Sequence, residues 1–140
     1  MIPFDVQRID HVVLRVTDLD RSIAFFGALL GCQVVQRREE LGLVHLRAGA
    51  SMIDLISVDG FLGRKGGLPP GAEGRNMDHV CLRIHPFDPR SILAFLNEAG
   101  VTPTQTAQAN FGAEGIGPAI YFRDPDGNEI ELKGPSTDAA

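Results

Sequence analysis

Two histidines lie at equivalent places in nearly identical hexapeptides. Residues 10–15 read Asp-His-Val-Val-Leu-Arg and residues 78–83 read Asp-His-Val-Cys-Leu-Arg, which makes His11 and His79 counterparts. Carboxylates stand in other alternating segments, as Asp54 and Glu131. Histidine and carboxylate ligands together suit Zn, Ni, Fe or Mn, and the ligand types alone do not select among these metals. The residues are compatible with a metal centre, and also with ordinary polar side chains at sheet edges.

The likeness of the two hexapeptides continues into the residues that follow them. Ser22, Ala24, Phe25 and Gly31 recur as Ser91, Ala94, Phe95 and Gly100. We therefore interpret the chain as a single domain, 1–140, built from two copies of one module, about 5–58 and 74–136. The linker of residues 59–73 is rich in glycine and proline. We expect it to be the least ordered part and to cover the site when substrate binds.

Hydrophobic periodicity predicts the order βαβββ in each module, which is an α+β fold. The first module should contain strands at 9–17, 33–38, 42–48 and 51–58, with a helix from Asp20 to Gly31. The second should contain strands at 77–85, 102–107, 118–123 and 128–133, with a helix at 88–99 whose Ile92, Phe95 and Leu96 face inward. The last two strands are joined by Asp-Pro-Asp-Gly-Asn, a hairpin signal. We expect one curved mixed sheet with the helices on its convex face.

Alternation along the strands predicts which side chains share the face away from the helices. This face should carry His11, Arg15, His45, Arg47, Asp54, His79, Arg83, Glu129, Glu131 and Lys133. Arginines recognise carboxylate or phosphate groups, so Arg15 and Arg47, together with His45, are predicted to bind an anionic substrate. The alternative is that the arginines form ordinary salt bridges.

Composition limits the classes of partner. The chain has 140 residues, 44% hydrophobic and 22% charged, with a formal net charge of -5. The acidic balance argues against nucleic acid as a partner. The sequence shows no apolar stretch long enough to span a membrane and no secretory leader pattern, and its two cysteines form no disulfide framework. We therefore expect a cytoplasmic protein without a membrane partner.

Four motifs resemble the vicinal oxygen chelate superfamily, which includes glyoxalase I, thiol transferases, extradiol dioxygenases and bleomycin-binding proteins. They are Ile9–Val12, Asp18–Phe26, Leu30–Gly31 and Phe122–Leu132, the last being the most specific. The resemblance implies a divalent metal, Ni, Zn, Fe or Mn, held by His11, Asp54, His79 and Glu131. Similar enzymes usually have a longer side chain at the position of Asp54. We therefore expect Asp54 to be a weak or water-mediated ligand that serves as the base.

Short chains of this kind are most similar to glyoxalase I. This resemblance implies a metal-dependent lyase or isomerase that chelates a small substrate through vicinal oxygens, with Asp54 and Glu131 as catalytic carboxylates. Arg15 matches a glutathione-contacting arginine of that family, whereas Val58 replaces an asparagine. The alternatives are an Fe(II)-dependent ring-cleavage-type dioxygenase, a thiol transferase acting on an antibiotic, and a non-catalytic binding protein for a small molecule such as an antibiotic. We also expect a homodimer.

Overall fold

The computed structural model describes residues 1–137, and the chain divides into two compact units. The first unit comprises residues 1–70 and the second begins at Gly71. The boundary falls within the glycine-rich segment that the sequence marks as a linker. No helix within residues 1–137 is long and apolar enough to span a membrane.

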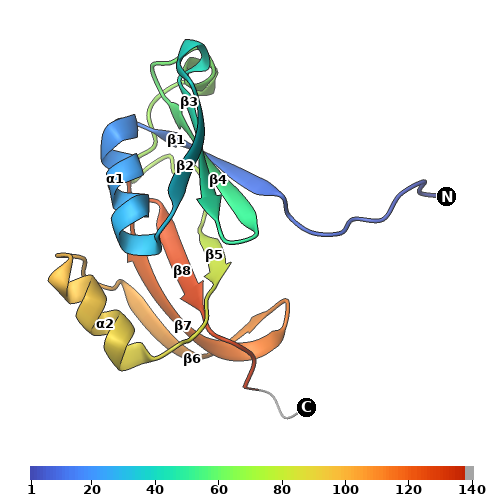
Figure 1. Ribbon diagram of the computed structural model, residues 1–140, viewed down its shortest axis with the longest axis vertical. Helices are drawn as coiled ribbons and strands as arrows, with labels where there is room; N and C mark the ends of the chain where they lie inside the picture. Colours follow the sequence, from blue (N-terminus) through green and yellow to red (C-terminus); the bar gives the residue numbers. More distant parts are fainter. Residues whose placement is uncertain (138–140) are drawn as a thin grey trace. The chain divides into compact units, whose positions relative to one another are not determined.

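The first unit has the predicted order βαβββ (Figure 1). Its elements are β1 (His11–Val16), α1 (Leu19–Leu30), β2 (Gln33–Arg38), β3 (Leu43–Ala48) and β4 (Ser51–Ser57). The strand order is β1-β4-β3-β2, in which β1 runs parallel to β4 and the other pairs are antiparallel. The core consists of alternate strand residues and the inner face of α1, with Leu14, Leu46, Leu55 and Phe26 almost fully buried.

Helix α1 begins two residues earlier than the sequence suggested. Asp18, not Asp20, is the N-cap, and its carboxylate accepts a hydrogen bond of 3.1 Å from the backbone N–H of Arg21. The helix ends at Gly31, whose φ of 67° lies in the left-handed region that glycine adopts without strain.

The second unit repeats the same order. Its elements are β5 (Val80–Arg83), α2 (Pro89–Glu98), β6 (Gln105–Gly112), β7 (Gly115–Arg123) and β8 (Glu129–Lys133). The strand order β5-β8-β7-β6 matches that of the first unit, again with the first strand parallel to the last. The α+β class and the tandem repeat are therefore confirmed, with four strands in each of two mixed sheets.

The structure corrects two details of the second unit. Strands β6 and β7 extend well beyond the predicted 102–107 and 118–123, and meet in a tight hairpin between Gly112 and Gly115. Glycines at this end of the hairpin hid the strand pattern, because glycine is depleted in ordinary strands. Phe95 is exposed on α2 rather than packed inward, whereas Leu96 is buried as expected.

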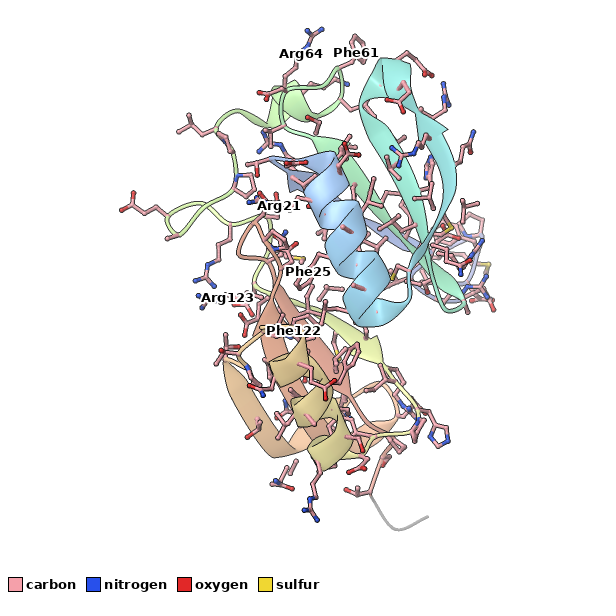
Figure 2. All side chains as sticks on the ribbon, turned by 60° about the vertical axis from the view of Figure 1, so that its left-hand side comes forward. Arg21, Phe25, Phe61, Arg64, Phe122 and Arg123 are labelled. Carbon is pink, nitrogen blue, oxygen red and sulfur yellow. The ribbon has the colours of Figure 1, made fainter. Side chains whose placement is uncertain are left out.

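The Asp124–Asn128 connection forms the predicted hairpin. Asp124 is buried, and one of its carboxylate oxygens accepts hydrogen bonds from the backbone N–H groups of Asp126 and Asn128. The Asn128 side chain donates to the other carboxylate oxygen at 2.7 Å. Gly127 supplies the positive φ, 82°, that this turn requires. In the strand before the turn, Phe122 is buried and Arg123 faces solvent beside Glu129 (Figure 2).

Candidate metal and substrate site

In each unit a strand that begins at or directly after a histidine runs parallel to a strand that carries a carboxylate. In the first unit Val13 pairs with Asp54, and in the second Cys81 pairs with Glu131. Val13 and Cys81 are themselves counterparts in the repeated hexapeptides. Asp54 and Glu131 are therefore equivalent in register, as His11 and His79 are in sequence.

In the first unit Asp54 lies between two histidines. His11 Nε2 is 3.9 Å from Asp54 Oδ2, and His45 Nδ1 is 2.9 Å from Asp54 Oδ1. His45 comes from β3, where it is the direct cross-strand partner of Asp54. The Asp54 side chain is only 7% exposed, although it lies on the polar face of the sheet.

One oxygen of Asp54 has no hydrogen bond. Oδ1 is buried and, among residues 1–137, finds no hydrogen-bond partner; His45 Nδ1 is close but is not directed at it. A buried carboxylate oxygen without a partner is costly, because it has lost its water and gained nothing in exchange. Carboxylate oxygens and imidazoles are preferred ligands of divalent transition metals, so this oxygen is chemically suited to ligate one.

In the second unit His79 contacts Glu131 directly. His79 Nε2 lies 3.2 Å from Glu131 Oε2, and the Glu131 side chain is 6% exposed. The other oxygen, Oε1, accepts a hydrogen bond of 2.9 Å from the Asn110 side chain of β6. Asn110 also donates to the Tyr121 hydroxyl at 2.7 Å. Glu131 is thus held in place by its surroundings, whereas Asp54 is not.

Hydrogen bonding governs the ionisation of Glu131. Burial by itself would raise the pKa of Glu131, but hydrogen bonds from Asn110, Tyr121 and Cys81, with the nearby His79, outweigh it and lower the pKa. Glu131 is therefore an anion at neutral pH, the form that a metal requires.

The two neighbouring acidic groups stay protonated. Burial, reinforced by the charge of Glu131, raises the pKa of Cys81 to about 12. Burial and the hydrogen bond to Glu131 raise the pKa of Tyr121 to about 12. Because the thiolate is the nucleophilic form of cysteine, Cys81 is unsuited to nucleophilic chemistry at neutral pH.

Both histidines are oriented by the aspartate that precedes them. His11 Nδ1 lies 2.7 Å from Asp10, and His79 Nδ1 lies 2.5 Å from Asp78. These hydrogen bonds raise the pKa of both imidazoles. They also leave each Nε2 directed toward its carboxylate, an arrangement that metal-binding histidines share.

The predicted substrate arginines differ in their contacts. Arg15 donates from three guanidinium nitrogens to the backbone carbonyls of Gly63, Gly67 and Leu68, at 2.8–3.0 Å. In this structure Arg15 therefore fastens the segment after β4, and its contact with a substrate stays a prediction. Arg47 is exposed and reaches only the Ser51 carbonyl, at 3.5 Å. Its predicted role also stays a prediction.

The segment held by Arg15 is shaped by its glycines. It contains a short 3-10 helix, Gly63–Gly66, and a Cβ at Gly66 would lie 2.3 Å from the Arg15 guanidinium. A Cβ at Gly63 would lie 1.8 Å from the Ser57 carbonyl oxygen. On the outer side, Arg64 lies over the Phe61 ring, 5.3 Å from its centre (Figure 2). The predicted opening and closing of residues 59–73 stays a prediction.

A hollow of about 300 Å³ opens beside His79. It is lined by Arg75, Asp78, Gln105, Tyr121, Arg123 and Glu129 as well as His79. Its polar lining suits a small hydrophilic molecule. Among residues 1–137 no group of three or more His, Cys, Asp and Glu side chains is arranged so that it could hold a metal ion. The structure places His11 and His45 beside Asp54, and His79 beside Glu131.

Several residues around the carboxylates were not predicted from the sequence. Asp10 and Asp78 directly precede the two histidines in the repeated hexapeptides, so the repeat could have indicated that they contact them. Tyr121 occupies the register position opposite Glu131 that His45 occupies opposite Asp54, and only the strand register reveals this. Asn110 lies on the part of β6 that the sequence did not identify as strand.

The chain matches one protein family over almost its whole length. The sequence profile of the Glyoxalase/Bleomycin resistance protein/Dioxygenase superfamily matches residues 8–132. The chain belongs to this superfamily. The family resemblance proposed from the sequence is thereby confirmed.

Two similar proteins carry different functional names. The virulence protein STM3117 of Salmonella typhimurium is 30% identical over 128 residues, which cover 91% of this chain and 83% of the relative. Its crystal structure gives a TM-score of 0.78 at 28% identity, over 95% of this chain and 100% of that one. The glutathione transferase FosA of Serratia marcescens is 28% identical over 127 residues, covering 91% of this chain and 80% of FosA.

A structure with a bound metal shares the fold. The fosfomycin resistance protein FosX of Listeria monocytogenes, solved with Mn(II) and a sulfate ion, gives a TM-score of 0.67 at 16% identity. The match covers 95% of this chain and 94% of FosX. Proteins with this fold thus include one that was solved with bound Mn(II).

Proposed function

We propose that the protein is a metal-dependent lyase or isomerase of the glyoxalase I type. The observation that supports this proposal is the buried Asp54 carboxylate, whose Oδ1 has no hydrogen bond. His45 Nδ1 lies 2.9 Å from Oδ1, and His11 Nε2 lies 3.9 Å from the other oxygen, Oδ2. The proposed metal ligands are His11, His79 and Glu131, with Asp54 as a weak or water-mediated ligand. A divalent ion such as Mn, Ni, Zn or Fe supplies Lewis-acid chemistry, which stabilises negative charge on neighbouring substrate oxygens.

The two carboxylates have different tasks in this proposal. Glu131 is fixed by Asn110 and ionised at neutral pH, so it serves as a firm ligand. Asp54 has a shorter side chain and a free oxygen, so it accepts the proton that leaves one substrate carbon and returns it to the next. His45 Nδ1 lies 2.9 Å from that oxygen without a hydrogen bond to it.

One position of the first unit differs from glyoxalase I at the site where similar enzymes contact glutathione. Val58, which replaces the asparagine of similar enzymes, is 7% exposed and packs in the core of the first unit. It therefore offers no polar contact to glutathione. A second candidate function, transfer of a thiol to a small molecule, is favoured by the 28% identity to FosA.

Paired variants test the proposal. Protein loaded separately with Ni, Zn, Mn and Fe is assayed with a glutathione hemithioacetal, with oxygen uptake recorded. We expect Asp54→Asn to retain metal and to lose roughly 10²–10⁴-fold in turnover, the usual contribution of a general base. Glu131→Ala should lose the metal. Full turnover in Asp54→Asn would remove Asp54 from the mechanism, and oxygen uptake with Fe would favour the dioxygenase instead.

A further inference from the structure

A lysine is buried on the same face of the second sheet as Glu131. Lys133 is only 6% exposed, although it is the last residue of β8. Glu131 and Lys133 are two residues apart on one strand, so their side chains share a face. Alternation along the strand predicted this face for Lys133, but not its burial.

The buried ammonium group has little to compensate its charge. Lys133 Nζ donates one hydrogen bond, of 3.1 Å, to the backbone carbonyl of Gly115. No carboxylate within residues 1–137 lies at salt-bridge distance from it. An ammonium group carries three donors, and a buried charge is normally paired with an opposite one. Lys133 therefore lacks an anionic partner.

The strands beside Lys133 are shaped to admit its side chain. A Cβ at Gly112 would lie 2.9 Å from Lys133 Cε, and a Cβ at Gly117 would lie 3.0 Å from Nζ. Ala119, its cross-strand partner on β7, is also small. The corresponding position in the first unit is Ile56, since Arg15 pairs with Ile56 as Arg83 pairs with Lys133. An apolar residue thus satisfies the fold at this position, and the lysine requires another explanation.

A second cation lies beside Lys133. Arg83 is its register partner on β5, and its guanidinium binds the Glu114 carboxylate at 2.7 Å. Glu114 lies at the tip of the β6–β7 hairpin, and its side chain is 56% exposed. The arginine is thus occupied by a solvent-exposed carboxylate that an external anion can displace.

We propose that Lys133 and Arg83 form a subsite for an anionic oxygen group of a small molecule, a carboxylate, phosphonate or phosphate. Glu114 occupies the Arg83 side of this subsite in the free protein. Two residues along a strand span about 6.6 Å, so the subsite lies roughly that far from Glu131. The inference rests on the proposed function insofar as it names the anionic end of the same substrate.

Inorganic phosphate is the probe, with acetate for comparison. The chain has two lysines, so the Cε–Hε signals of Lys133 and Lys65 can be resolved by NMR and assigned with Lys65→Met. Titration of the metal-free full chain should shift the Lys133 signal to saturation and leave Lys65 unmoved. Lys133→Met should weaken phosphate binding at least tenfold by calorimetry, and Lys65→Met should not change it.

A second variant should strengthen phosphate binding where Lys133→Met weakens it. A purely structural role for Lys133 and Arg83 would not produce this gain. Glu114→Gln frees Arg83, so it should tighten phosphate binding several-fold. A Lys133 signal that does not saturate, or a Glu114→Gln variant that binds phosphate no better than wild type, would overturn the proposal. Because these titrations use metal-free protein, a failure of the metal-dependent function would appear separately, as absent metal binding with phosphate binding intact.

Discussion

Asp54 and Glu131 show how two equivalent positions can acquire different chemistry. Both are buried carboxylates on a last strand, each beside a histidine. Glu131 Oε1 is satisfied by Asn110, whereas Asp54 Oδ1 is not satisfied by any group of residues 1–137. The satisfied carboxylate is suited to fixed ligation, and the unsatisfied one to exchange of a proton or a ligand.

The support of Glu131 gives a prediction at the residue scale. Asn110→Ala removes a hydrogen bond to the ionised carboxylate, which contributes about 1.5–3 kcal/mol. Metal affinity should fall by roughly 10–100-fold, the usual effect of losing an outer contact to a ligand. Competition with a chromophoric chelator measures this, with Asn97→Ala on α2 as the control. Unchanged affinity in Asn110→Ala would mean that Asn110 does not support the ligand.

Arg15 makes contacts that the sequence did not predict. The alternation of side chains along β1 placed Arg15 on the polar face of the sheet. Alternation does not reveal which backbone carbonyls a side chain will contact. Removing its hydrogen bonds to residues 63–68 should destabilise that segment by about 1–2 kcal/mol. Arg15→Ala should therefore be cleaved there roughly tenfold faster by a protease, with Arg47→Ala as control. Equal cleavage of the two variants would contradict this role.

At the scale of elements, the helix caps are set by local sequence. Asp88 caps α2, since its carboxylate accepts hydrogen bonds from the Arg90 backbone N–H and from the Ser91 hydroxyl. These hydrogen bonds, that from Ser91 foremost, lower the pKa of Asp88 from its ordinary value of 3.8. A lowered pKa means that the ionised form stabilises the fold above the ordinary pKa. This stabilisation disappears as the pH falls through the lowered value.

Asp88→Ala should accordingly lower the melting temperature at pH 7, by roughly a few degrees, and much less near pH 2. Asp88→Asn is the matched control, because asparagine also caps helices but does not titrate in this range. Its melting temperature should stay near that of wild type at pH 7. Thermal unfolding followed by circular dichroism measures both, and an equal loss in Asp88→Ala at both pH values would refute the assignment.

Periodicity predicted the elements of the first unit almost to their ends, because its strands alternate regularly and Gly31 marks the end of its helix. The same reasoning ended the predicted β6 too early and began the predicted β7 too late. The glycines at 112, 115 and 117 carry no side chains that could show the alternation of a strand. These glycines are also the residues that border Lys133. The candidate histidines could be found from the repeat, and alternation placed the carboxylates and Lys133 on one face. The contact of Asn110 with Glu131 and the burial of Lys133 required the register of strands distant in sequence.

At the scale of the whole molecule, we predict a homodimer. The motivation is the tandem repeat, because two modules in each chain allow two equivalent sites in a twofold assembly. The segment before β1 also exposes three alternating apolar side chains, Ile2, Phe4 and Val6. Light scattering at micromolar concentration should give twice the mass of 15.1 kDa. A stable monomer under those conditions would contradict the prediction.

The metal content of the protein tests the central claim most directly. Protein purified without chelators or an affinity tag is analysed for transition metals, alongside Glu131→Ala and the matched variant Glu129→Ala, which alters a neighbouring carboxylate on the same strand face. We predict about one divalent ion per chain in wild type and in Glu129→Ala, and almost none in Glu131→Ala. Wild-type protein that holds no Mn, Ni, Zn or Fe even after incubation with these ions, or equal loss in the two variants, would contradict the account.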